Sequence, residues 1–103
     1  MQTFAKKRIE ILIERALLKR LTEKLERTGV SGYSVAPVVG GRGRAGRWEA
    51  DGQVGAAAGM FVVWCIVDPV RLDELLQAVF AVVAQQVGLV SVGDVEVVRP
   101  ERF

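Results

Sequence analysis

The stretch from Met60 to Val67 is apolar at every position. A strand with one wet face alternates apolar and polar residues, whereas a strand buried on both faces is continuously apolar. The helices of such a small domain cover only one face of a sheet. We therefore expect a neighbouring subunit to cover the other face, and the stretch predicts an oligomer.

The first part of the chain predicts a strand, a helix and a second strand. Apolar and charged residues alternate from Lys7 to Glu14, which is the period of a strand. From Ala16 the apolar period becomes helical. The apolar stripe of this helix consists of Leu17, Leu18, Leu21 and Leu25. Gly29 ends the helix, because a left-handed residue is favoured there. A short strand from Gly32 to Ala36 follows, and Pro37 stops it.

The part after the apolar strand predicts a second helix and a last strand. Asp68 is the expected N-cap of this helix, and Pro69 its first residue. The expected core stripe consists of Leu72, Leu75, Leu76, Val79, Phe80 and Val83. Gly88 ends the helix, and the last strand runs from Leu89 to Val98 with a kink or bulge at Gly93-Asp94.

The order of these elements is strand-helix-strand, repeated once. This order is typical of the split βαβ, ferredoxin-like arrangement, an α+β fold. The sequence therefore predicts a four-stranded antiparallel sheet with two helices on one face. Residues 1–103 are expected to form a single domain, in which the long segment 37–59 joins the two halves.

The composition excludes several classes of site. The chain of 103 residues has a formal net charge of +2, which is too small to predict broad binding of nucleic acid. It contains no His and one Cys, so a zinc site with such ligands, a disulfide framework and a Ser-His pair are excluded within one chain. No secretory leader or membrane-spanning run is recognisable, so the expected location is the cytoplasm.

Glycine and arginine are concentrated between Val38 and Trp48, within segment 37–59. Glycines allow backbone N–H groups to approach an anion, and Arg42, Arg44 and Arg47 add forked donors. The same composition also fits a flexible linker or an RGG-like contact with RNA. The spacing of the glycines matches no strict nucleotide fingerprint, so the residues alone leave these alternatives open.

Three other places are candidates for ligand contacts. The turn at Gly88, Leu89 and Val90 presents backbone amides, although an ordinary helix end has the same sequence. Glu14, at the end of the first strand, is suited to bind a ribose or a base, or else is simply exposed. In the C-terminal segment, Arg99 and Arg102 are either solvated or bind phosphates on a neighbouring subunit.

The pattern as a whole resembles the PII superfamily of signalling proteins, and most closely its PII-like branch associated with carboxysomes and bicarbonate transport. The resemblance covers nearly the whole chain. It is carried by Ile13–Lys19, by Thr28–Val35, and by Val87–Val90 together with Asp94–Val97. Segment 37–59 stands where that family has its T-loop, and Gly88 stands where it has its B-loop.

The resemblance implies a homotrimer whose clefts between subunits bind adenine nucleotides. The T-loop base would consist of Gly40, Gly41, Arg42 and Gly43. The B-loop residues would be Gly88, Leu89 and Val90, which meet the base or the phosphates. Arg99 and Arg102 would neutralise phosphate charge, and Glu14 would contact the nucleotide. Bicarbonate would be the second ligand, next to the T-loop base, with Arg42, Arg44 or Arg47 as its cationic partner.

Two departures from the family pattern refine these expectations. Segment 37–59 contains no Tyr and no Ser, so the covalent modification known in PII proteins has no acceptor there. Leu89 and Val90 follow Gly88 where the family has a phosphate-binding lysine, which favours ADP or AMP over ATP.

The implied function is regulatory and not enzymatic, with no cofactor. The expected protein partner is a carboxysomal protein or a bicarbonate transporter, which would place the chain in the cytoplasm in association with carboxysomes. One alternative is a structural or scaffold trimer of an assembly such as a carboxysome. Another is a metal-binding relative of the CutA type, which the lack of His disfavours.

Overall fold

The computed structural model describes residues 1–43, 46–49, 59–84 and 88–102. The strands are β1 (Phe4–Glu14), β2 (Ser34–Pro37), β3 (Gly40–Gly43), β4 (Gly46–Glu49), β5 (Met60–Val67) and β6 (Gly88–Val97). The helices are α1 (Arg15–Arg27) and α2 (Leu72–Val83), with short 3-10 turns η2 (Pro69–Arg71) and η3 (Pro100–Arg102).

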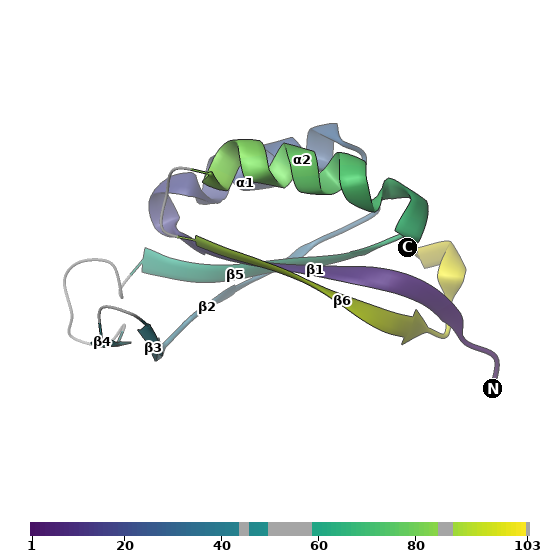
Figure 1. Cartoon of the computed structure of the whole chain (residues 1–103), viewed down its shortest axis with the longest axis horizontal. Coiled ribbons are helices and arrows are strands. Elements are labelled where there is room, and N and C mark those ends of the chain that lie inside the picture. Colours follow the sequence, from purple (N-terminus) through teal and green to yellow (C-terminus); the bar gives the residue numbers. More distant parts are fainter. Residues whose placement is uncertain (44–45, 50–58, 85–87, 103) are drawn as a thin grey trace.

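The main sheet has four strands in the order β2-β5-β1-β6, and every neighbouring pair is antiparallel. Both helices lie on one face of this sheet (Figure 1). The predicted ferredoxin-like fold is therefore confirmed. It follows from the two strand-helix-strand halves, which interleave so that β1 and β5 occupy the centre.

The core lies between the helices and the face of the sheet that they cover. The alternation in β1 places Ile9, Ile11 and Ile13 on this face, and all three are fully buried. Their partners from the other elements are Val63, Cys65 and Val67 of β5, Leu17, Leu21 and Leu25 of α1, and Leu75, Val79, Val82 and Val83 of α2. Burial raises the pKa of the Cys65 thiol to about 11, so this thiol stays protonated at neutral pH.

The core stripe of α2 differs from the predicted one at Phe80. The side chain of Phe80 is 64% exposed, whereas Val82 is 8% exposed and belongs to the core. The buried positions follow the spacing 75, 79, 82, 83, and Phe80 lies roughly a third of a turn from the centre of this stripe. Phe80 instead borders an open apolar hollow with Leu76 and Val90.

The last strand has no bulge, contrary to the prediction at Gly93-Asp94. The ladder between β1 and β6 is continuous from the Phe4–Val97 pair to the Ile13–Gly88 pair. Asp94 is compatible with this strand because it forms an ion pair across the ladder with Lys7. The expected break was wrong because an edge strand tolerates a polar residue that has a cross-strand partner.

The start of the second helix also differs from the prediction. Pro69 begins the 3-10 turn η2, and α2 proper begins at Leu72. The Asp68 carboxylate does not cap this turn, and instead accepts a hydrogen bond from the Lys6 ammonium. The second strand, β2, begins at Ser34 rather than at the expected Gly32. It ends at Pro37, as expected, and Pro37 itself belongs to it because an edge strand tolerates the missing N–H.

Alternate residues of β5 are only half buried in the single chain. Val62, Trp64 and Ile66 share the face turned away from the helices with Leu12 of β1 and Leu89 of β6, as the register shows. We call these five residues the open sheet face. The guanidinium of Arg8 lies over the Trp64 ring there, 4.4 Å from its centroid. The expected second layer of cover on this face stays a prediction.

Candidate functional site

Four strands meet in one row at the end of the sheet from which the long segment leaves. The register aligns Pro37 of β2, Phe61 of β5, Ile13 of β1 and Gly88 of β6. We call this row the terminal row. In Figure 1 it lies toward the side of the molecule that carries β3 and β4, and both chain termini lie at the other end. The segments 38–59 and 84–88 therefore begin and end at the same edge of the molecule.

The base of the long segment is tied to the sheet. The Val38 N–H donates to the Met60 carbonyl at 3.0 Å, and Met60 pairs with Glu14 in the ladder between β1 and β5. Gly59 allows a close approach, since a Cβ atom at this position would lie 3.3 Å from the Cβ of Arg15. These contacts bring the half-buried Glu14 next to both ends of the segment.

The predicted T-loop base forms part of a short hairpin. Residues Gly40–Gly43 form β3, which pairs with β4 and places Arg42 directly opposite Arg47. Arg44 lies outside the described residues.

The predicted B-loop residues are the first residues of β6. Gly88 pairs with Ile13 in the terminal row, and Leu89 and Val90 continue the ladder. The side chain of Leu89 is 62% exposed on the open sheet face, whereas Val90 packs against the core. Because β6 is an edge strand, the backbone groups on its outer side have no partner strand among the residues that the structure describes.

Arg99 and Arg102 lie at the opposite end of the sheet. Both follow Val97, which pairs with Phe4 at the far end of β1, and η3 contains Arg102. Figure 1 shows η3 beside the chain termini, away from the terminal row. Within one chain Glu14, Gly88 and the start of the long segment at Pro37 therefore share one end of the sheet, and the two C-terminal arginines lie at the other.

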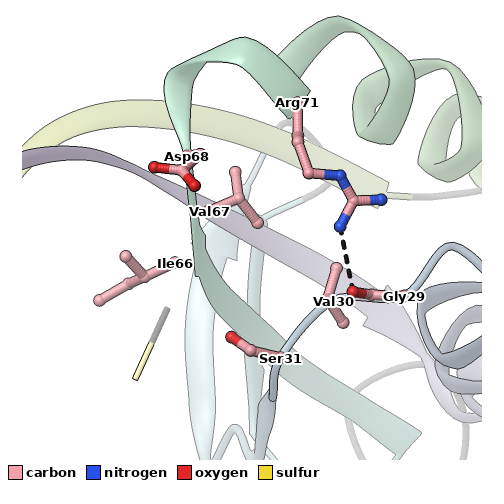
Figure 2. A pocket seen from close by; sticks show the side chains of 7 residues that line it. All are labelled: Gly29, Val30, Ser31, Ile66, Val67, Asp68 and Arg71. Carbon is pink, nitrogen blue, oxygen red and sulfur yellow. Dashed lines mark hydrogen bonds between the residues drawn. The ribbon is translucent and has the colours of Figure 1, made fainter. Parts of the chain in front are cut away.

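A cavity at the C-terminal end of α1 was not predicted from the sequence. It has a volume of about 220 Å³. Its walls include Gly29, Val30, Ser31, Ile66, Asp68 and Arg71 (Figure 2). Gly29 adopts a φ of 79°, which fits the predicted left-handed end of the helix. That glycine was the available signal, but the opposite wall comes from β5 and η2, which local sequence does not reveal.

Arg71 closes one side of this cavity and caps α1. Its guanidinium donates to the Gly29 carbonyl at 3.0 Å, as Figure 2 shows, and to the Thr28 carbonyl. It also forms an ion pair of 2.7 Å with Glu74. A cation at a helix C-terminus satisfies carbonyl groups that lack intrahelical partners and interacts favourably with the helix dipole. Arg71 therefore joins α1 to the start of α2.

We expect Arg71→Ala to lower the free energy of unfolding by about 1–2 kcal/mol, since two carbonyls lose a charged donor that is partly screened by solvent. Urea denaturation measures this change as a lower midpoint. Arg20→Ala is the matched control, because Arg20 is an exposed arginine of α1. Equal midpoints for the two variants would contradict the capping role of Arg71.

A family model for nitrogen regulatory protein P-II matches residues 6–102. Among solved structures, CPII, a nitrogen regulatory PII-like protein from Thiomonas intermedia K12, is similar with 26% identity and a TM-score of 0.84. The match covers 99% of this chain and 96% of that one, whose structure holds ADP, AMP and bicarbonate. A second CPII structure, with ADP and bicarbonate, has 27% identity, a TM-score of 0.82, and coverage of 99% and 97%.

A PII-like signalling protein from Thermus thermophilus is 25% identical, with a TM-score of 0.78 and coverage of 100% and 99%. Among proteins of curated function, none was found with a matching sequence. None of the helices in the described part of the chain is long and apolar enough to cross a membrane. The expected link to carboxysomes stays a prediction.

Proposed function

Because this chain belongs to the family of nitrogen regulatory protein P-II, we propose that it is a regulatory sensor of adenine nucleotide and bicarbonate. The nucleotide is ADP or AMP, and ATP is the weaker candidate. The protein is a cytoplasmic homotrimer without catalytic activity, and its ligands occupy the clefts between subunits. Solved relatives that hold ADP, AMP and bicarbonate support this choice of ligands.

The terminal row is the observation that carries the proposal. At this end of the sheet lie Pro37, from which the long segment leaves, Glu14 beside Met60, and Gly88 at the start of β6. Arg99 and Arg102 follow the strand end at the opposite end. A cleft between two copies joins the terminal row of one subunit to the C-terminal arginines of the next, so that the glycine segments and the cations surround one nucleotide.

The hairpin formed by β3 and β4 provides the second half of the site. The register pairs Arg42 with Arg47, and we assign the bicarbonate to the arginines of this hairpin. Bicarbonate is small and planar, and it matches the forked donors of a guanidinium. Arg44 remains a further candidate in the same segment. Anion binding therefore favours the paired hairpin over its open forms.

The open sheet face supports the trimer. Its five residues are apolar, yet within one chain they are only partly covered. Three copies that turn these faces toward a common axis bury them and bring the two ends of neighbouring sheets together. This assembly explains why β5 is continuously apolar. It also explains why some proposed site residues lie at the terminal row and others at the opposite end of the sheet.

Signalling follows from the coupling between ligand and hairpin. The hairpin has a paired state and an open state. A ligand shifts the balance between them only as far as it binds one state more tightly than the other. The hairpin thereby reports carbon and energy status to a protein partner. That partner is a carboxysomal protein or a bicarbonate transporter.

The test is a calorimetric titration of the wild-type protein and of Arg42→Ala with bicarbonate and ADP. We expect Arg42→Ala to weaken bicarbonate binding about tenfold or more, because one charge-assisted contact is lost. The affinity for ADP should fall less, and the oligomeric state should not change. Arg20→Ala is the control for the loss of an exposed arginine. Wild-type affinities of Arg42→Ala for both ligands would contradict the assignment.

A further inference from the structure

Arg15 lies beside the terminal row and is not among the residues assigned above. It is the first residue of α1 and follows Ile13 by two positions. Its guanidinium lies over the Phe61 ring, 5.2 Å from the ring centroid. Ile13 pairs with Phe61 on one side and with Gly88 on the other. Arg15 therefore lies at the terminal row, against Phe61 of β5 and beside Gly59, where the long segment ends.

The charge of Arg15 is not neutralised within the described part of the chain. The side chain is exposed and forms no ion pair with a described carboxylate, including that of the neighbouring Glu14. Arg71, by contrast, donates to the carbonyls of Gly29 and Thr28 and pairs with Glu74.

The Phe61 ring holds the guanidinium in a defined place. A cation over an aromatic face is attracted to the ring, and the planar guanidinium keeps its N–H donors free at the edge of the stack. A pre-positioned side chain loses less conformational entropy when a ligand binds. Gly59 leaves room for this arrangement, since its backbone passes close to the Cβ of Arg15.

We propose that Arg15 binds the terminal phosphate of a nucleoside diphosphate at the terminal row. This inference rests on the proposed function and deepens it. Gly88 supplies backbone groups, but Leu89 and Val90 carry no charge, so β6 itself brings no cation to this end. Arg15 supplies that cation from α1. Its forked donors fit a phosphate, and they distinguish nucleotides by their number of phosphates rather than by their base.

The test measures the affinities of adenosine, AMP and ADP for the wild-type protein, Arg15→Gln and the control Arg20→Gln. We expect Arg15→Gln to bind ADP about tenfold or more weakly, AMP less affected and adenosine unchanged. Arg15→Lys should recover part of the ADP affinity, since it keeps the charge without the fork. Phe61→Leu keeps Arg15 but removes the ring, and should weaken ADP binding by a smaller factor with adenosine unchanged.

An Arg15→Gln variant with the wild-type ratio of ADP to adenosine affinity would overturn this inference alone. An equal loss for all three ligands would also overturn it, because that result indicates a structural role. If the wild-type protein binds none of the three ligands, the proposed function itself fails, and this inference fails with it. If Arg15→Gln does not fold, Phe61→Leu still tests the inference, because it keeps Arg15 and removes only the ring that positions it.

Discussion

Leu12→Glu is expected to dissociate the proposed trimer into folded monomers. Leu12 lies at the centre of the open sheet face, where the register pairs it with Val62 and Leu89. In the single chain its side chain is only half buried, so a glutamate is tolerated in the monomer. In the trimer each copy would bury an unpaired carboxylate, which costs several kcal/mol.

The size of this effect makes it easy to measure. At 1.4 kcal/mol per tenfold change, the concentration at which the trimer dissociates should rise about a hundredfold or more. Sedimentation velocity at micromolar concentration reports the oligomeric state, and far-ultraviolet circular dichroism shows that the monomer is folded. Val70→Glu adds the same charge at a position that is 90% exposed outside the sheet, and it should remain trimeric. A trimeric Leu12→Glu variant would contradict the role of the open sheet face.

Elements with one unambiguous apolar period could be predicted from the sequence. The alternation of Ile9, Ile11 and Ile13 identified the buried face of β1, and all three are core residues. Leu17, Leu21 and Leu25 did the same for α1. In these segments most residues on the other faces are polar, so local periodicity and tertiary packing agree.

Prediction failed where several faces of an element are apolar, or where tertiary pairing overrides local preference. Apolar residues occur around most of α2, so sequence alone did not show that Val82 rather than Phe80 points to the sheet. Gly93-Asp94 resembles a break, but pairing with Arg8 and Lys7 keeps the strand regular.

The candidate site, too, could be predicted only in part from the sequence. The glycines and arginines of segment 37–59 were recognisable by composition, because few other residue types suit an anion and a close backbone approach. The pairing of Arg42 with Arg47 could not be predicted from composition, because it depends on the register of the hairpin. Arg15 gave no local signal at all. Its position depends on Phe61, which is distant in sequence and reaches Arg15 only through the ladder between β1 and β5.

The central claim is that adenine nucleotide and bicarbonate bind this protein together. Any ligand that binds only the folded state stabilises it by mass action, by about 2.7 kcal/mol at a hundred times its dissociation constant. For a domain of this size such a gain raises the melting temperature by about 10 °C or more. Bicarbonate should add to the shift produced by ADP, since the two sites share the T-loop base.

The most direct measurement is therefore a thermal-shift series with adenosine, AMP, ADP and ATP, each with and without bicarbonate. The account predicts a large shift with ADP or AMP, a smaller one with ATP, and an increase when bicarbonate is present. An unchanged melting temperature at millimolar concentrations of every nucleotide, with the trimer intact, would contradict the sensor and favour a structural trimer.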